Sequence, residues 1–246
     1  MKFRREWFKW QYMPFPDIHG NYNLWTQIKN YYKEKDILIF LGDAIDRGPD
    51  GIKILQEMLN DERVIFLLGN HEQMLLNYAN YGIHQALHIE KEVIQNNGSY
   101  LTLLDFLELT TKEQIELIDK LKNKTYMYYI YINKEKKNIF LSHAGLSVNN
   151  LYNFEKSDLL WNRDHIKQDK NWNNKFKHWY IIHGHSPIQL INPNKVTIEI
   201  YRYFNNHKID LDVCTTLSKT IAVLNLDTLQ VKYFKENDNN ETRDNE

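Results

Sequence analysis

The sequence contains very little cysteine. Cys214 is the single cysteine among its 246 residues, which excludes an intrachain disulfide and fits a reducing compartment. Long apolar runs are also missing, because none approaches the roughly 18 to 20 residues that a membrane-spanning helix needs. The stretch from Met1 to Glu6 is largely charged and lacks the continuous apolar segment of a secretory signal. These absences predict a cytoplasmic protein that does not enter a membrane.

The sequence also has little excess charge of either sign. Its formal net charge is −1, so no global basic surface indicates a nucleic-acid partner. The apolar fraction of 42% and the charged fraction of 26% are typical of globular proteins. With no repeat and no interdomain linker, the chain is expected to form a single domain over residues 1–235. The polar, acidic residues 236–246 are predicted to be a disordered tail.

Apolar runs and helical spacings alternate in the first half of the chain. The order predicts βαβ units and a largely parallel core. Strands are expected at 9–13, 36–41 and 63–68, helices at 23–32 and 49–60, and further helices over 72–124 with a break at Gly98-Ser99.

The second half is predicted to be richer in strands. Segments 125–132 and 138–141, joined by a turn rich in lysine and glutamate, indicate a hairpin, and another strand is expected at 179–182. After Pro193 the pattern indicates strands alone, at 196–200, 208–213, 220–226 and 230–234, with a turn at 225–228.

Polar clusters follow several of these apolar runs. In chain order they are Asp17-Ile18-His19-Gly20, Gly42-Asp43-Ala44-Ile45-Asp46-Arg47-Gly48, Gly69-Asn70-His71-Glu72, Ser142-His143-Ala144-Gly145 and His183-Gly184-His185-Ser186, with Leu160-Trp161-Asn162-Arg163 before the last. Since ligands of open α/β sheets bind at the carboxyl ends of strands, these clusters are candidates for one common site.

The residue types in these clusters suit divalent cations. An aspartate and a histidine two positions apart in an extended segment, such as Asp17 and His19, point to the same side and can share one ion. Carboxylate, amide and neutral imidazole ligands suit Mn, Fe or Zn. A carboxylate can also bridge two ions, which together activate a water for in-line attack on phosphorus. Arg47 and Arg163 are planar cations matched to phosphate oxygens.

The clusters resemble the signature of the metallophosphoesterase superfamily in its phosphoprotein-phosphatase form. The similarity is to DxHG, GDxxDRG, GNHE, HAG and GH[ST], in family order over residues 17–186. Gly69 to Met74 and Leu160 to Arg163 resemble the bacterial and phage branch typified by the lambda phosphatase. The resemblance implies an α/β fold of two mixed sheets packed as a sandwich and flanked by helices, with a helical cap over about 73–124.

The resemblance also implies a role for each residue. Asp17 and His19 would bind a first metal, Asp43 would bridge both metals, and Asn70, His143 and His185 would bind the second. His71, oriented by Asp46, would act as general acid while Arg47 and Arg163 hold the phosphate. The cofactors would be two divalent ions, with Mn first and Fe or Zn as alternatives.

The activity implied is hydrolysis of phosphate monoesters by a hydroxide that bridges the two metals. The first hypothesis is a serine/threonine protein phosphatase, whose partner would be a phosphorylated protein or a small phosphoester. A symmetrical diadenosine tetraphosphate hydrolase is an alternative with the same core motifs. A catalytically inactive phosphopeptide-binding module is the alternative of another class, although the presence of both Asp46 and His71 argues against it.

Other residues have simpler interpretations. His183 is expected to support or pack against the site, Glu72 to support it, and His84 and His88 to lie on an ordinary helix face. Arg163 could also be a solvated loop residue. Two positions depart from the family pattern. Pro16 stands where a small residue is usual, and Asp212-Val213-Cys214 replaces an Asp-Thr-Gly segment, so the local backbone at both places is expected to differ.

Overall fold

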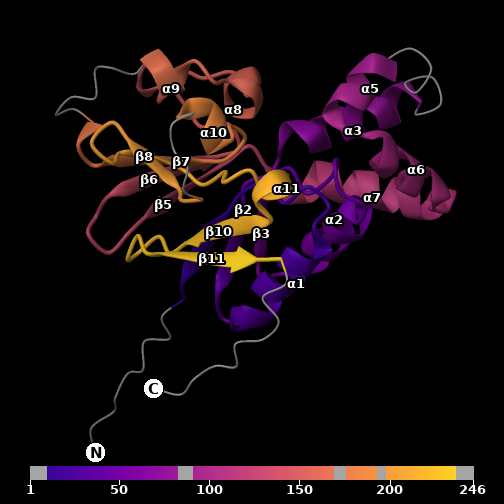
Figure 1. Ribbon diagram of the computed structural model, residues 1–246, viewed down its shortest axis with the longest axis horizontal. Helices are drawn as coiled ribbons and strands as arrows, with labels where there is room; N and C mark the ends of the chain where they lie inside the picture. The colour runs from indigo at the N-terminus through magenta and orange to yellow at the C-terminus, as the bar shows by residue number, and fades with distance from the viewer. Residues whose placement is uncertain (1–9, 83–90, 169–175, 193–197, 237–246) are drawn as a thin grey trace, which may run out of the picture.

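The computed structural model describes residues 10–82, 91–168, 176–192 and 198–236. Two β-sheets pack face to face, and helices cover the outer face of each (Figure 1). In Figure 1 helices α3, α5, α6 and α7 gather on one side of the molecule, and α8, α9 and α10 lie over the second sheet. The predicted fold class, an α/β sandwich with flanking helices, is confirmed.

The first sheet is parallel and follows the order β1-β2-β3-β4. A separate two-stranded sheet, the antiparallel hairpin of β10 and β11, lies beside β1, where the Leu226 amide just after β10 donates to the Tyr12 carbonyl at 3.0 Å. The strands are β1 (Tyr12–Phe15), β2 (Ile37–Phe40), β3 (Val64–Leu67), β4 (Thr125–Tyr126), β10 (Thr220–Leu224) and β11 (Val231–Lys235).

The second sheet is mixed and follows the order β5-β6-β7-β9-β8. Its three central strands run parallel, and the two edge strands pair antiparallel with their neighbours. The strands are β5 (Tyr128–Ile132), β6 (Asn138–Ser142), β7 (Trp179–His183), β8 (Tyr201–Tyr203) and β9 (Lys208–Asp210).

The helices connect these strands and follow apolar spacings in the sequence. Asn21 caps the first helix by accepting the Leu24 amide at 3.2 Å, and Thr110 caps α7 in a capping box with Glu113. The longer helices are α1 (Tyr22–Tyr31), α2 (Gly51–Asn60), α3 (Asn70–Tyr81), α5 (Lys91–Asn97), α6 (Tyr100–Glu108) and α7 (Thr111–Lys124). The short ones are η1 (Val148–Asn150), α8 (Lys156–Trp161), α9 (His165–Gln168), α10 (Ile188–Ile191) and α11 (Thr215–Ser218).

Alternation of side chains along the strands creates the layers. On β2, Leu38 and Phe40 pack under helices α1, α2 and α7, whereas Ile39 faces the second sheet. On β6, Ile139 faces the first sheet and Phe140 packs beneath η1 and α8. The central strands of both sheets are therefore buried on two faces, which explains why they appear in the sequence as continuous apolar runs.

Most predicted elements are present, with shifts of a few residues at their ends. The helical break at Gly98-Ser99 and the hairpin of β5 and β6 are confirmed. The predicted strand over 125–132 is instead divided, because β4 pairs with β3 in the first sheet and β5 pairs with β6 in the second. The chain therefore crosses between the sheets at Met127, a change of partner that no local pattern specifies.

Two predictions for the last third of the chain are wrong. Residues 198–200, the described part of the strand expected at 196–200, are not in a strand, and the strand begins at Tyr201. The short helix α11 contradicts the expectation of strands alone after Pro193. The helix is a single turn, Thr215–Ser218, between the segments expected as strands at 208–213 and 220–226. A segment of four residues is too short to show helical spacing in the sequence.

Several predictions fall on residues outside the described ranges. These are the helix-face interpretation of His84 and His88 and the disorder of 237–246. Glu236, the first residue of the predicted tail, is held in place because its amide donates to the Lys219 carbonyl at 2.8 Å. Among the described residues, no helix has the length and apolar character that crossing a bilayer requires.

Replacement of Phe40 tests the packing of the first sheet. Phe40 is fully buried, and its ring centroid lies 5.0 Å from that of Phe15 and 4.9 Å from that of Phe66. We expect Phe40→Ala to lower the free energy of unfolding by about 3–5 kcal/mol in denaturant melts. Ile115→Ala, at a side chain that is 58% exposed on α7, should change it by less than about 0.5 kcal/mol. Equal effects of the two variants would contradict this core assignment.

Candidate metal centre

The parallel strands of both sheets deliver polar side chains to one end of the sandwich. Asp17 and His19 follow β1, the Asp43 loop follows β2, and Asn70 follows β3. From the second sheet, His143 follows β6 and His185 follows β7. All six predicted metal ligands are buried there. The structure therefore brings together residues that lie as far as 168 positions apart in the sequence.

The carboxylate of Asp43 lies at the centre of this cluster. Its Oδ2 is 3.8 Å from Nε2 of His19, 3.7 Å from Nε2 of His71 and 3.4 Å from Nε2 of His143. Its Oδ1 accepts the His71 amide at 3.1 Å. Two groups of potential ligands share this carboxylate: one with His19 and His71, the other with His143 and His185. This central place agrees with the bridging role predicted for Asp43.

Backbone hydrogen bonds orient two of the imidazoles. Nδ1 of His19 lies 2.9 Å from the Ile45 carbonyl, and Nδ1 of His143 lies 2.9 Å from the Leu41 carbonyl. Each Nδ1–H therefore donates to a carbonyl, and the lone pair of Nε2 points toward Asp43. A metal-binding histidine is normally fixed in this way, because the outer hydrogen bond selects its tautomer.

The remaining predicted ligands surround the same carboxylate. Asn70 Oδ1 lies 2.7 Å from Nε2 of His143, and His185 Nδ1 lies 3.1 Å from that nitrogen. Asp17 Oδ1 accepts the His185 amide at 3.0 Å, while its Oδ2 lies 3.9 Å from Nε2 of His19. Asp17 thus links the loop after β1 to the loop after β7, one from each sheet.

The cluster fits divalent cations on its own chemistry. Nε2 of His19 and Nε2 of His185 are buried and have no hydrogen-bond partner in the protein. Burial lowers the pKa of His143 to about 4, which favours the neutral imidazole that a metal requires. Burial, reinforced by Asp17, raises the pKa of Asp43, which shows how unfavourable its negative charge is without a cation nearby. Oxygen and imidazole donors of this kind suit Mn, Fe or Zn.

Asp46 and His71 form a buried pair beside the centre. Nδ1 of His71 donates to Oδ2 of Asp46 at 2.5 Å, and the same oxygen accepts the Ser99 hydroxyl at 2.7 Å. Nε2 of His71 faces Asp43 and lies 3.5 Å from Nη2 of Arg47. The arrangement leaves Nε2 directed into the site, where it can exchange a proton with a bound molecule.

The helical segment over 73–124 holds this pair from outside. The Asp46 amide donates to the Thr102 hydroxyl at 2.9 Å, and the Arg47 amide donates to the Gly98 carbonyl at 2.9 Å. Ser99 stands at the N-cap of α6, yet its hydroxyl makes no cap bond to that helix and bonds Asp46 instead. Sequence reasoning missed Ser99 and Thr102, because hydroxyls at a helix start are read as ordinary caps.

Glu72 fixes the loop that carries Asp43. Its Oε2 accepts the amides of Asp43 at 2.9 Å and Gly69 at 3.1 Å, and its Oε1 accepts the Ala44 amide at 2.7 Å. A Cβ at Gly69 would lie 2.2 Å from Oδ1 of Asp43, so glycine is required for this close approach. Glu72 takes the supporting place predicted for it.

The two predicted phosphate-binding arginines lie at the exposed edge of the centre. Arg47 and Arg163 are both solvent-exposed, and Nη2 of Arg163 donates to the His185 carbonyl at 3.2 Å. Arg163 is thus attached to the site and is not only a solvated loop residue. Both guanidinium groups are accessible from solvent, so each is available to contact a phosphate that enters the site.

Left-handed backbone is concentrated at this end of the molecule. His19, Asp43, Asp46, Arg47 and His185 all have positive φ, between 44° and 70°. Such conformations are unfavourable for residues other than glycine and collect where surrounding structure enforces them. The hydrogen bonds to Glu72 and to the α6 segment supply that constraint here.

The two departures from the family pattern leave the cluster assembled. Pro16 is buried, and Asp17 beyond it still reaches the His185 amide. Cys214 adopts φ of 59°, the left-handed conformation that the expected glycine would favour, and its amide donates to Oδ1 of Asp212 at 2.8 Å. Cys214 therefore adopts a left-handed conformation that glycine takes more readily.

His183 lies behind the centre rather than in it. Its Nε2 is 2.6 Å from the Tyr203 hydroxyl, and its Nδ1 is 2.9 Å from the Gly184 carbonyl. Both nitrogens are therefore engaged, and within the described residues it belongs to neither group of potential metal ligands. This agrees with the packing role that the sequence predicts.

Comparisons with known proteins find similarity to phosphoesterases. The family profile described as Calcineurin-like phosphoesterase matches residues 15–215. A Bis(5'-nucleosyl)-tetraphosphatase PrpE [asymmetrical] of Halalkalibacterium halodurans is 22% identical, over 70% of this chain and 77% of that protein. Serine/threonine-protein phosphatase 2 of Escherichia coli is 29% identical, over 63% of this chain and 69% of that protein.

Two further similarities are more partial or more distant. A symmetrical Bis(5'-nucleosyl)-tetraphosphatase of Buchnera aphidicola is 29% identical, over 53% of this chain and 43% of that protein. A solved protein serine/threonine phosphatase from Saccharomyces cerevisiae superposes with a TM-score of 0.53 at 11% identity, covering 94% of this chain and 82% of that one. At such identity the solved structure supports the fold alone.

Glu72→Gln tests the support of the Asp43 loop. Glutamine has one acceptor oxygen, so its amide nitrogen would face at least one backbone N–H that the carboxylate now satisfies. We expect a loss of about 1–3 kcal/mol in unfolding free energy, the cost of an unsatisfied buried group. Thermal and denaturant melts measure it. Glu113→Gln, at an exposed capping box, should cost clearly less, and equal losses would contradict the assignment.

Ser99→Ala tests whether the hydroxyl positions the buried pair. We expect kcat for phosphoester hydrolysis to fall about tenfold with little change in KM, because a hydrogen bond to a charged group contributes ~1.5 kcal/mol or more. Metal content should stay at the wild-type value. Thr110→Ala removes a cap hydroxyl far from the site and should leave kcat unchanged. A wild-type kcat in Ser99→Ala would remove the positioning role.

Proposed function

Because the chain belongs to the calcineurin-like phosphoesterase family, we propose that it hydrolyses phosphate esters at the buried Asp43 cluster, with His71 protonating the leaving group. The observation that carries this proposal is the Asp46–His71 hydrogen bond of 2.5 Å beside Asp43. A module that only binds metal does not need a buried carboxylate–imidazole pair directed into its site, because no proton has to be transferred there. The inactive phosphopeptide-binding alternative is therefore disfavoured.

Each predicted ligand has a place in the proposed centre. Asp17 and His19 would hold one cation, Asn70, His143 and His185 the other, and Asp43 would serve both. When bound, two divalent cations, Mn first and Fe or Zn as alternatives, would supply the hydroxide nucleophile and neutralise phosphate charge. His71 also lies in the first group of potential ligands, but its Nδ1 bond to Asp46 suits a proton donor.

The protein's own residues then account for substrate positioning and proton transfer. Arg47 and Arg163 would orient the phosphate from the exposed side, each guanidinium offering paired N–H donors. Protonated His71 would deliver the proton on Nε2 to the departing oxygen, while Asp46 stabilises the imidazolium through Nδ1. Ser99 and Thr102 would hold Asp46 in the orientation that this transfer needs.

Two substrate classes fit this chemistry. A serine/threonine phosphoprotein is the first, because two arginines suit the dianion of a monoester and a serine/threonine phosphatase is among the similar proteins. A dinucleoside tetraphosphate is the second, since other similar proteins carry that name. A cytoplasmic location, with no membrane or nucleic-acid partner, belongs to the same proposal.

His71→Asn tests the general acid directly. We expect hydrolysis of a phosphoserine peptide to fall by about 10²–10⁴-fold, the usual contribution of acid catalysis. Hydrolysis of 4-nitrophenyl phosphate should fall much less, because nitrophenolate departs readily without a proton. Metal content, measured by plasma mass spectrometry, should be retained. An equal loss on both substrates would contradict the acid role and favour a metal-ligand role for His71.

A further inference from the structure

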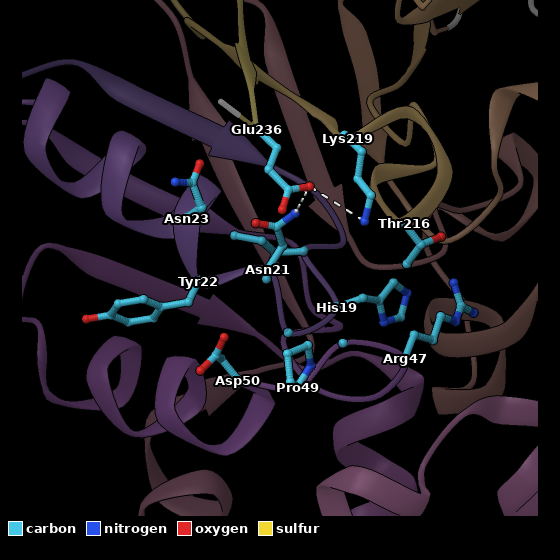
Figure 2. Close-up of a pocket in the computed structure, with 13 residues that line it drawn as sticks. His19, Asn21, Tyr22, Asn23, Arg47, Pro49, Asp50, Thr216, Lys219 and Glu236 are labelled. Carbon is cyan, nitrogen blue, oxygen red and sulfur yellow. Dashed lines mark hydrogen bonds and ion pairs between the residues drawn. The ribbon is translucent and has the colours of Figure 1, made fainter. Parts of the chain in front are cut away.

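A pocket of about 240 Å³ opens beside the metal centre. His19 and Arg47 line its inner end, so the pocket and the candidate centre share two residues. Figure 2 shows Thr216 and Lys219 on the upper side of His19, with Asn21 beyond and Pro49 and Asp50 below. His19 belongs to this lining, while its Nε2 lies 3.8 Å from Oδ2 of Asp43 in the candidate centre.

The pocket combines several features that favour an anion. Helices α1 and α2 begin at its wall, with Tyr22 and Asp50 among the lining residues, and helix N-termini present unpaired N–H groups and a positive dipole end. Arg47 supplies a guanidinium and Lys219 an ammonium to the lining, which also carries the carboxylates of Asp50 and Glu236. The Lys219 side chain is 60% exposed and so remains accessible to a ligand.

The Glu236 carboxylate already occupies the place beside Lys219. Oε2 of Glu236 lies 3.5 Å from Nζ of Lys219 and accepts Nδ2 of Asn21 at 3.4 Å (Figure 2). Both contacts are long, and the Glu236 side chain is 32% exposed, so the interaction contributes little to stability. A phosphate oxygen could take the same two donors, and its charge would meet Lys219 more strongly than the carboxylate does.

The aromatic residue of the pocket is unsuited to base stacking. Nζ of Lys53 lies 3.4 Å from the centroid of the Tyr22 ring, and the Tyr22 hydroxyl donates to Glu57 at 2.7 Å. One ring face and the hydroxyl are therefore engaged. The charged side chains of the lining suit a phosphate, which carries negative charge, better than a purine ring, which is neutral.

We propose that this pocket is a subsite for a further phosphate of a polyphosphate ester, in which Lys219 binds that phosphate and Glu236 gives way to it. The inference rests on the proposed function and narrows its substrate class. With one phosphate at the metal centre, a neighbouring phosphate in a chain would extend past Arg47 into the pocket. A phosphoserine peptide has no second phosphate to place there, so the subsite favours a dinucleoside polyphosphate.

Lys219→Met and Glu236→Gln test this subsite with a dinucleoside tetraphosphate and with 4-nitrophenyl phosphate, which has one phosphate. Lys219→Met should raise KM for the tetraphosphate about fivefold, a value reduced for solvent exposure of the ammonium. Glu236→Gln should lower that KM about threefold, because a competing carboxylate is removed. Neither variant should change kcat/KM for 4-nitrophenyl phosphate more than about twofold.

Lys232→Met is the matched control, since Lys232 lies on β11 over the Tyr31 ring and outside the pocket. It should leave both substrates unaffected. Equal losses on both substrates in Lys219→Met, or an unchanged KM for the tetraphosphate, would overturn the subsite. Cleavage of 4-nitrophenyl phosphate without cleavage of the tetraphosphate would overturn it while the proposed function stands. Failure to cleave either with Mn, Fe or Zn present would overturn the proposed function itself.

Discussion

The buried carboxylate of Asp43 is the constraint on which the rest of the site depends. Three imidazole Nε2 atoms converge on its Oδ2 within 3.8 Å, and Glu72 fixes its loop through backbone amides. Burial and the nearby Asp17 disfavour its charge, so the protein holds a carboxylate where an isolated one would be costly. Divalent cations would offset that cost. The buried ligands and the fixed histidine tautomers are therefore explained by the same requirement, which is to bind cations.

The architecture explains how such a cluster can be rigid. In both sheets the central strands are buried, and the carboxyl ends of the parallel strands meet at one end of the sandwich. Asp17 links a loop from one sheet to a loop from the other. The α6 segment adds a second constraint, because Ser99 bonds the side chain of Asp46 and Thr102 bonds its backbone amide. Arg47 and Lys219 place positively charged groups between this cluster and the solvent.

The sequence predicts much of this because the informative residues are local. Glycine-flanked polar clusters after apolar runs locate the candidate ligands, and helical spacing locates α1, α2 and the helices over 72–124. The failures have tertiary causes. The segment expected as one strand at 125–132 divides between two sheets at Met127, and the short helix α11 lies in a region where strands alone were expected. The hydroxyl of Ser99 bonds Asp46 across the fold, which no spacing in the chain reveals.

The most direct test of the account is a crystal structure of the Mn-loaded protein with anomalous scattering measured at the manganese edge. We expect two anomalous peaks, one for each metal ion, with the Asp43 carboxylate between them. One of the two peaks should be surrounded by Asn70, His143 and His185. His71 should remain bonded to Asp46, with its Nε2 free of metal. A single peak, no peak, or a metal bound directly to Nε2 of His71 would contradict the assignment of bridging carboxylate and proton donor.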